Sequence, residues 1–414
     1  PSQAQMLYSK ASLTASAIEV RPRKEHQIMS GFGFSEDQDT LRQEVRRFAQ
    51  KELGPGALER SKMQPQELHE NLRDIDKKIV DLGWTKINVP EKYGGYPFGH
   101  VEIGIIIEEV HKVDPTVEPP SGMEATSVLL QTLPQDIQDE WFPPLISREK
   151  RHSFGFTESA AGSDAAGIVT KAVRDGDDYI INGEKTPLPG ATVADAVTIS
   201  TKTDHNAGFK GISLFWVPVD LPGVTITPLP WMGNASLYPS YVTFDDVRIP
   251  ARYREGEEGM GFYTVMGTLD WLRIIVALTC LARAQASLAD AMAWSQERKT
   301  FGRLIAANQG VSYPIAEHHT MIEAARMLCY RTLWLKDQGQ PHTVESSMAK
   351  WFSVEASVQC IKDMMVIIGH PGYSTEHPIS MRLRDVMGYL LGDGPPQIQK
   401  MIIARLMIGK AVVG

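Results

Sequence analysis

The chain has 414 residues, of which 43% are hydrophobic and 22% charged, a composition typical of globular proteins that excludes a disordered or collagen-like chain. Its 42 Lys and Arg residues against 50 Asp and Glu residues give a net charge of -8, so we expect no nucleic-acid or membrane partner held by a general positive field. Three widely spaced cysteines, Cys280, Cys329 and Cys360, argue against a disulfide framework and favour a reducing compartment. We therefore expect a cytoplasmic protein, or one of the mitochondrial matrix in a eukaryote.

Residues 1–34 are polar, mixed in charge and without the apolar core of a secretory signal. We expect them to be an N-terminal arm or a tag remnant. The longest apolar run, residues 274–281, is ended by Arg283 before it reaches the ~18–20 residues that a membrane span needs. The sequence therefore predicts no membrane-spanning segment.

Helical periodicity dominates the next part of the chain. Ser35 caps a predicted helix over residues 35–53, and apolar residues at intervals of three and four predict a second helix over residues 68–82. A more apolar helix is predicted through residues 103–110. We expect an N-terminal α-helical domain over residues 35–150.

From Arg151 onward, apolar residues recur at every second position instead of at helical intervals. Five short β-branched runs, separated by Asp- and Gly-rich turns, predict a middle β-domain over residues 151–255. Helical periodicity then returns over residues 256–414, with breaks near Gly302, Gly339, Gly369 and Gly392. The sequence predicts an α+β fold that ends in a C-terminal four-helix bundle. The predicted strands are YIINGEK, AVTISTK, GISLFWVPV, GVTITPL and YVTFDDVRIP.

Several well-known site motifs are missing. The chain has no GxGxxG between a strand and a helix, no Walker A loop, no GxSxG turn and no HExxH helix. The cluster Glu317-His318-His319 places its two histidines on different faces of a helix, so we expect no metal site there.

Three distant segments instead combine into one pattern. They are FGFTESAAGSDAAGI (154–168), ERKTFGRLIAANQ (297–309) and DVMGYLLGDGPPQIQKMIIAR (385–405). Together they resemble the FAD-dependent acyl-CoA dehydrogenase family, whose signatures are TEPxAGSD, RKxFG and YEGTxQIQR. The resemblance extends from Phe34 to Gly409. It implies bound FAD, a helix–β–helix architecture, and removal of an alpha proton and a beta hydride from an acyl thioester.

The resemblance also assigns cofactor residues. Arg298 would reach the FAD pyrophosphate held by a neighbouring subunit, which suits the fixed fork of a guanidinium. Without the resemblance, Arg298 would be interpreted as a cation at a helix C-terminus. A shared cofactor implies a homotetramer or a homodimer. The cofactor residues implied are Phe156, Thr157, Ser163, Arg298, Thr300, Phe301, Gln309 and Gln397.

Asp393 stands where the family's YEGT motif has its catalytic Glu. The chemistry needs a carboxylate whose pKa is raised by a dry pocket, and Leu390 and Leu391 are expected to supply that pocket. An Asp side chain is shorter than Glu, and a misplacement of ~1 Å can cost about 10²-fold in rate. The alternative is that Asp393 only caps the last helix. Some other branches of the family place the base on the first long C-terminal helix, where this chain has Leu272, so that position supplies no base here.

The substrate residues implied are Ser163, Asp270, Arg273 and Gly394, with Asp270 and Arg273 on one helix face. A simple helix salt bridge is the alternative for that pair.

Two segments depart from the family pattern. KTPLPGA (185–191) replaces KxWITNG, so Pro187 and Pro189 stand where Trp and Thr would contact the flavin. In VIIGHPG (366–372), Val366 replaces a Gln that holds the adenine half. His370 there either reaches a phosphate or, as we favour, caps a helix.

Three functions compete at this point. The leading one is an acyl-CoA dehydrogenase of fatty acid metabolism, acting on an acyl-CoA or acyl-carrier thioester and passing electrons to an electron-transfer flavoprotein. The second is an oxidase or eliminase similar to nitroalkane oxidase. The third, suggested by the two prolines, is a flavin-binding homologue with impaired catalysis.

Overall fold

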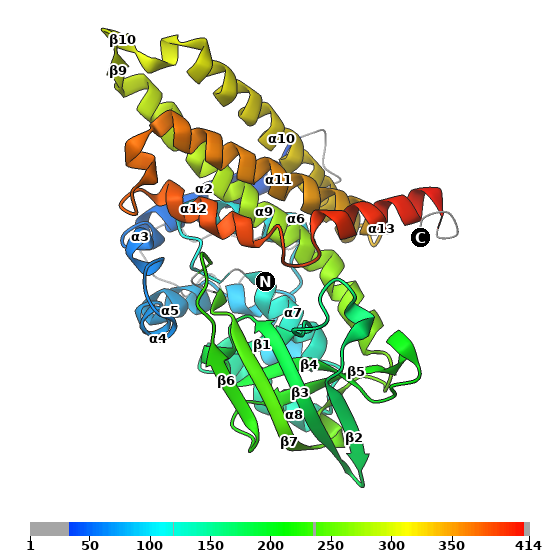
Figure 1. Ribbon diagram of the computed structural model, residues 1–414. Helices are drawn as coiled ribbons and strands as arrows, with labels where there is room; N and C mark the ends of the chain where they lie inside the picture. Colours follow the sequence, from blue (N-terminus) through cyan, green and yellow to red (C-terminus); the bar gives the residue numbers. More distant parts are fainter. Residues whose placement is uncertain (1–32, 119, 235–236, 410–414) are drawn as a thin grey trace.

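The computed structural model describes residues 33–118, 120–234 and 237–409, so residues 1–32 of the predicted arm lie outside the described part. Figure 1 shows long helices packed side by side in one half of the molecule and a β-sheet in the other half. Shorter helices from the first part of the chain pack behind the sheet and against the long helices. The predicted order of helices, strands and helices is confirmed.

The first helix begins at a capping box. The Gln38 amide donates to Ser35 Oγ at 3.2 Å, and the Ser35 amide donates to Gln38 Oε1 at 3.0 Å. The helix predicted over residues 68–82 is two helices, because the chain breaks at Leu72. The helices of this part are α2 (Glu36–Phe48), which a π-helical turn (Ala49–Leu53) continues, α3 (Ala57–Arg60), α4 (Pro65–Asn71), α5 (Arg73–Asp81), α6 (His100–Val113), α7 (Pro120–Leu130) and α8 (Gln135–Ile146).

The sheet has eight strands in the order β6-β7-β3-β2-β4-β5-β8, with β1 pairing in parallel with β4. The five predicted strands correspond to β3 to β7, whereas β1, β2 and β8 were not predicted. The strands are β1 (His152–Gly155), β2 (Lys171–Asp175), β3 (Asp178–Leu188), β4 (Ala196–Lys202), β5 (Ile212–Pro218), β6 (Val224–Pro228), β7 (Ser240–Pro250) and β8 (Arg254–Glu255).

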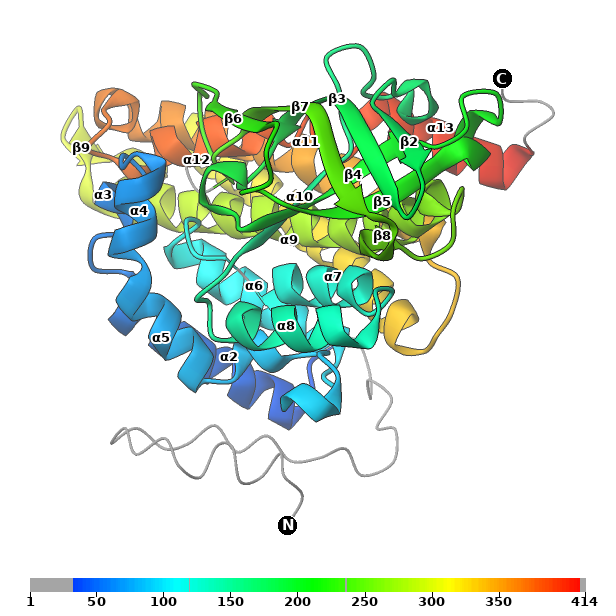
Figure 2. The same cartoon turned by 90° about the horizontal axis from the view of Figure 1, so that it is seen from below.

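The central strands are buried on both faces. Ala196 of β4 and Trp216 of β5 pack against α7 and α8, while Val197 and Phe215 belong to a core within the β-domain. Every residue of β4 is buried, which explains its continuous apolar run. Figure 2 shows α7 and α8 on the side of the sheet that faces the N-terminal helices.

Five helices follow, and the glycine breaks separate them as predicted. The longest, α9, packs against α6, α10, α11 and α12. A short hairpin, β9 (Lys299–Thr300) with β10 (Arg303–Leu304), connects α9 to α10 at the end of the bundle far from the sheet (Figure 1). The helices are α9 (Gly261–Glu297), α10 (Gln309–Asp337), α11 (Thr343–Ile368), α12 (Pro378–Gly388) and α13 (Pro396–Ile408).

One helix in the described ranges, α9, has the length and hydropathy of a membrane span, contrary to the expectation that no segment reaches it. Two thirds of its apolar window, 67%, is buried inside the protein. Its apolar composition is therefore used in packing against the other helices. The three cysteines are buried free thiols, as predicted.

A buried polar chain connects α7 to the sheet. Thr126 contacts His152 at 3.0 Å, His152 contacts the Thr198 hydroxyl at 2.8 Å, and that hydroxyl donates to Glu255 Oε1 at 2.6 Å. Burial raises the pKa of Glu255 to about 8 and lowers the pKa of His152 to about 3. Both side chains are therefore neutral near pH 7.

The Glu255 carboxyl makes stability depend on pH. Because its folded pKa of about 8 lies above the ordinary 4.5, its stabilising contribution is complete below pH 4.5 and is lost as the pH rises through 8. We expect the melting temperature of the protein to fall between pH 5 and pH 9, and the Glu255→Gln variant to lose several degrees less over that range. Thermal unfolding across this range measures the difference. The exposed control Glu257→Gln should follow the unmodified protein, and an identical slope in both variants would contradict the assignment.

Candidate active site

Asp393 lies in the loop between α12 and α13, in the left-handed region with φ of +54°. Its carboxylate accepts no hydrogen bond from any residue that the structure describes, whereas its backbone carbonyl accepts one from Gln399 Nε2 at 3.0 Å. The N-cap of α13 is Pro395, so the alternative that Asp393 caps this helix is wrong. The Asp393 side chain therefore neither caps α13 nor accepts a hydrogen bond within the described residues.

The loop that carries Asp393 is held by a buried lysine. Lys350, on α11, is fully buried and donates to the carbonyl oxygens of Tyr389 at 2.8 Å and Gly394 at 2.7 Å. Burial lowers its pKa to about 8, against the opposing effect of Asp393. The two acceptors lie on either side of Asp393 in the chain, so a single ammonium group fixes both ends of the loop.

Burial also raises the pKa of Asp393, and the nearby charges of Lys350 and Arg273 lower it. The group is thus a carboxylate with a raised pKa and two cations close by, as expected of a general base in a partly dry site. Leu391, which was expected to form the apolar wall, is 77% exposed, so that part of the prediction is wrong. Leu390 does pack against the helical core. A turn points successive side chains in different directions, which explains the difference.

Asp270 and Arg273 lie on one face of α9, as predicted, and pair at 2.8 Å. Asp270 also accepts a hydrogen bond from Thr343 Oγ1 at 2.6 Å, which connects α9 to α11. The Arg273 Nε atom is buried and has no hydrogen-bond partner in the described ranges. Asp270 therefore has a structural contact, whereas Arg273 keeps one donor for another group.

The predicted flavin segment follows β1. The backbone carbonyl of Phe156 accepts from Lys185 Nζ at 3.2 Å, and that of Thr157 accepts from the Thr186 amide at 2.8 Å. Ser163 is exposed, and its hydroxyl makes no hydrogen bond within the described part of the chain. These three residues lie in one stretch of backbone that follows β1 and passes beside β3.

A buried ion pair holds this segment, and sequence reasoning missed it. Lys185 and Glu158 are both buried and lie 2.6 Å apart. Glu158 also accepts the amides of Val169 at 2.6 Å and Thr170 at 3.1 Å. Burial lowers the pKa of Lys185 to about 8, while the pKa of Glu158 stays below its usual value because of Lys185 and these donors. Removing either partner would leave an unpaired buried charge.

Pro187, in β3, and Pro189, which directly follows β3, differ in their surroundings. Pro187 is exposed, and Pro189 forms part of the wall of a cavity of about 310 Å³. The Pro189 carbonyl accepts a hydrogen bond from the Ser153 hydroxyl. Neither ring is packed into the core, so the prolines do not close the space beside β3.

A second cavity, of about 520 Å³, lies at the β9–β10 end of the bundle. It brings together Arg298 and Thr300 with Val366 and His370 from the end of α11. The C-cap of α11 is Gly369, so the expectation that His370 caps this helix is wrong, and His370 lines the cavity instead.

The structure does not gather all the predicted cofactor residues in one place. Arg298 and Thr300 lie at the hairpin end of the bundle, with the fully exposed Phe301 in the hairpin turn. The sheet that carries Phe156 lies at the other end of the molecule (Figure 1). The two remaining predicted residues, Gln309 at the start of α10 and Gln397 in the first turn of α13, are exposed.

Comparison with known proteins agrees with this architecture. Family models match the acyl-CoA dehydrogenase N-terminal domain over residues 35–149, the middle domain over 153–247 and the C-terminal domain over 259–408. The chain belongs to the acyl-CoA dehydrogenase family. It is therefore an oxidoreductase with the helix–β–helix fold of that family, as the sequence motifs predicted.

Similar proteins cover nearly the whole chain. A probable acyl-CoA dehydrogenase of Bacillus subtilis, YngJ, is 34% identical over 91% of this chain and 99% of its own length. The caffeyl-CoA reductase-Etf complex subunit CarC of Acetobacterium woodii is 33% identical over 91% of this chain and 100% of its own length. The structure of butyryl-CoA dehydrogenase from Megasphaera elsdenii superimposes with a TM-score of 0.82 and 30% identity, over 91% of this chain and all of that one.

Lys350 offers a test of the loop geometry. Its positive charge favours the ionised form of Asp393, so the Lys350→Met variant should move the pH midpoint of substrate-dependent flavin reduction upward by about one unit. Stopped-flow reduction across pH measures this midpoint. Lys362→Met, on the exposed face of α11, is the control and should leave the midpoint in place. A variant that loses only thermal stability, with its midpoint unmoved, would contradict the role of Lys350.

Proposed function

We propose that this chain is an FAD-dependent dehydrogenase of acyl thioesters in which Asp393 removes the alpha proton. The observation that carries the proposal is the Asp393 carboxylate itself. It has a raised pKa, lies beside two buried cations and takes no part in a local cap or hydrogen bond. A buried carboxylate without a hydrogen-bond partner lowers the stability of the fold, and such groups are typical of functional sites.

The residues present fit FAD, the cofactor of this family's enzymes. The guanidinium of Arg298 and the Thr300 hydroxyl would hold the pyrophosphate at the 520 Å³ cavity. Phe156, Thr157 and Ser163 would contact the isoalloxazine along the segment that follows β1. Pro189 offers no hydroxyl to that ring, so the hydrogen bond that the family takes from a Thr is absent in this chain.

The reaction follows from the chain's own groups. FAD, when bound, supplies the two-electron acceptor. The Asp393 carboxylate takes the proton from the carbon alpha to the thioester, and the electron pair of that C–H bond becomes the new C=C bond as the beta hydrogen leaves as hydride. The products are an enoyl thioester and a protonated Asp393, and the backbone at Gly394 would orient the thioester carbonyl. Lys350 keeps the loop in place during the transfer.

The same residues weigh against the two other functions. An oxidase similar to nitroalkane oxidase would use Asp393 on an already acidic carbon and would not need Arg273 beside it. A homologue with impaired catalysis is the expectation if the two prolines blocked the flavin. Pro187 is exposed and Pro189 borders open space, which favours a working site.

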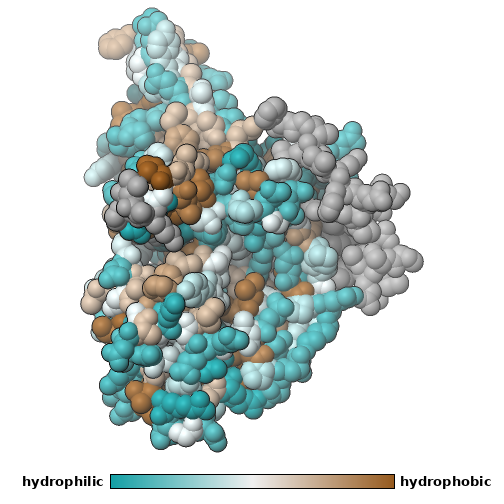
Figure 3. Space-filling model, turned by 90° about the vertical axis from the view of Figure 1, so that its right-hand side faces the viewer, coloured by the Kyte–Doolittle hydropathy of each residue, from teal (hydrophilic) through white to brown (hydrophobic). Residues whose placement is uncertain are grey.

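We also propose that two or more copies of the chain complete each cofactor site. The Arg298 end and the Phe156 end of one chain lie far apart, so a single FAD would contact two subunits (Figure 1). Apolar side chains gather beside the end of α13 (Figure 3), where Leu406, Met407 and Ile408 are 51%, 69% and 63% exposed. Such a face is typical of a subunit contact. The CarC relative is named as part of a complex with Etf, which supports an electron-transfer flavoprotein as the electron acceptor.

Replacing the base is the direct test of the reaction. Asp393→Asn should keep bound flavin, because the side chain holds no other group, and should slow anaerobic bleaching of the flavin by acyl-CoA by about 10²- to 10⁴-fold. Single-turnover spectroscopy follows the bleaching. Asp246→Asn, an exposed aspartate that shares the left-handed backbone conformation, is the matched control. Unchanged reduction in Asp393→Asn would remove this residue as the base.

Arg298 tests the cofactor site. Loss of its charged hydrogen bonds in Arg298→Ala should weaken FAD retention about tenfold or more. The flavin-to-protein ratio after gel filtration at several dilutions gives the retention. Arg303→Ala, in the same hairpin and bonded only to Asn308 in the described structure, is the control. Full occupancy of Arg298→Ala at every dilution would contradict its role.

A further inference from the structure

The 310 Å³ cavity begins at the elements that carry the predicted base. Tyr389, whose carbonyl is bound by Lys350, and Val276, one helical turn beyond Arg273, both line it. The cavity extends from there between α9, α7 and the loop after β3 toward the N-terminal helices. At ~30 Å³ per water molecule it has room for roughly ten non-hydrogen atoms.

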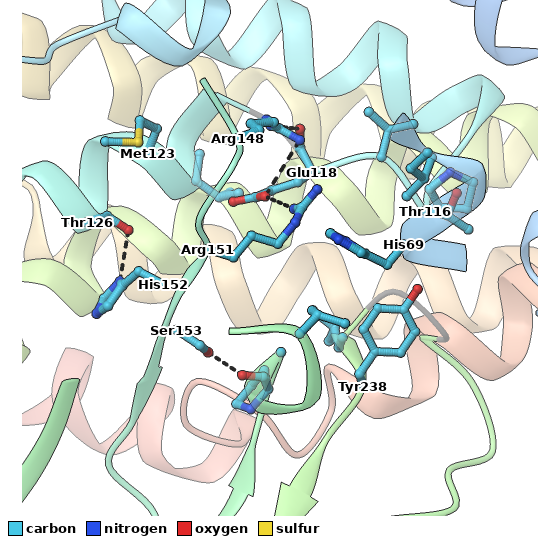
Figure 4. A pocket seen from close by; sticks show the side chains of 18 of the residues that line it. His69, Thr116, Glu118, Met123, Thr126, Arg148, Arg151, His152, Ser153 and Tyr238 are labelled. Carbon is cyan, nitrogen blue, oxygen red and sulfur yellow. Dashed lines mark hydrogen bonds and ion pairs between the residues drawn. The ribbon is translucent and has the colours of Figure 1, made fainter. Parts of the chain in front are cut away.

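The walls of this cavity change in character along its length. Near α9 they are apolar and include Ile275 and Val276, with Val117 and Leu145 from the N-terminal part of the chain. The far part is polar. Figure 4 shows His69, Arg151 and Tyr238 on the same side of the cavity, with Glu118 next to Arg151.

Apart from Arg283 Nε, which lies 3.6 Å from the Asp385 carboxylate, three polar atoms in this cavity lining have no hydrogen-bond partner among the residues that the structure describes. They are the Tyr238 hydroxyl, the Thr85 hydroxyl and Arg151 Nε. Tyr238 is 8% exposed and Thr85 is 2% exposed, so bulk water does not satisfy them. All three can donate a hydrogen bond, and Arg151 Nε can only donate. An occupant that satisfies them must carry an acceptor oxygen.

The charges of Arg148 and Arg151, at the polar part of the cavity, are already balanced. Arg148 and Arg151 each lie 2.5 Å from Asp76, and Glu118 lies 3.2 Å from Arg151 and 3.8 Å from Arg148. Burial and the charge of Arg151 lower the pKa of His69, so this ring is neutral near pH 7.

The other ionisable groups of the lining do not change that balance. Burial lowers the pKa of His111 and His152 to about 3 and raises that of Tyr238. The Lys150 ammonium has no carboxylate partner among the described residues; it lies over the Trp141 ring at 4.2 Å, and Trp141 is outside the cavity lining. Arg283 lies 3.6 Å from Asp385. At Arg148 and Arg151, a bound carboxylate would therefore meet cations that already have a carboxylate partner.

We infer that this cavity binds the distal end of the acyl group and selects an uncharged hydroxyl or carbonyl oxygen there. The inference rests on the proposed acyl-thioester reaction and names its substrate class: an acyl group with an apolar body and a neutral oxygen near its end. A purely apolar acyl group would leave the three donors without hydrogen-bond partners, and a carboxylate would have to compete with Asp76 and Glu118 for the two arginines.

Three thioesters that differ only at the distal position test the inference with the holoenzyme. They are 3-phenylpropionyl-CoA, 3-(4-hydroxyphenyl)propionyl-CoA and 3-(4-carboxyphenyl)propionyl-CoA. Anaerobic flavin bleaching gives a second-order rate constant for each. The hydroxyl compound should react about tenfold faster than the other two. In Tyr238→Phe this preference should fall severalfold, whereas the exposed control Tyr263→Phe should keep it.

The outcomes separate the inference from the function on which it rests. Equal rates for all three compounds, with donors satisfied by water alone, would overturn the inference and leave the dehydrogenase function standing. Fastest reduction by the carboxylate compound would also overturn it. Bleaching by none of the three, nor by butyryl-CoA, would overturn both. A preference that survives in both Tyr238→Phe and Thr85→Val would show that these hydroxyls do not select the oxygen.

Discussion

The architecture depends on the burial of α9, which passes through the centre of the molecule and contacts other helices along most of its length. A charged side chain on such a helix is stable only if it meets a partner from a neighbouring element. Asp270 meets α11 through Thr343, and Arg283 lies near Asp385 of α12. Gln285 donates to Glu108 of α6 at 2.7 Å. These pairings fix three other helices around α9 and thereby decide where the loop after α12 lies.

The same principle explains the site. Lys350 and Arg273 bring two cations into an interior that disfavours charge, and both have their pKa lowered by burial. The charge of Asp393 opposes that shift in both cations, and burial raises the pKa of Asp393 itself. Burial therefore makes Asp393 more basic than an exposed aspartate, while the two nearby cations oppose that change. The same burial that packs the helices together therefore also shifts the pKa of Asp393, Lys350 and Arg273.

The sequence predicted the broad organisation because that organisation rests on local signals. Helical and strand periods located the long elements, and glycines marked the breaks between helices. Asp393 was found through its position in a motif. Lys350 and Lys185 were missed, because a single lysine in an amphipathic pattern is usually exposed and their partners are distant in the sequence. The polar cavity could not be predicted either, since its three unpaired donors come from three separate parts of the chain.

The hydrogen bonds from Lys350 to both ends of the loop that carries Asp393 bear on how substrate could reach the site. Movement of this loop would take the carbonyls of Tyr389 and Gly394 away from the buried Lys350 ammonium. The ammonium would then lose both hydrogen bonds. The segment from Tyr389 to Gly394 is therefore held at both ends by hydrogen bonds to one buried ammonium, which disfavours its movement. If Asp393 is the base, substrate entry and product departure would then depend on other boundaries of the cavity, and the carboxylate would keep its position during turnover.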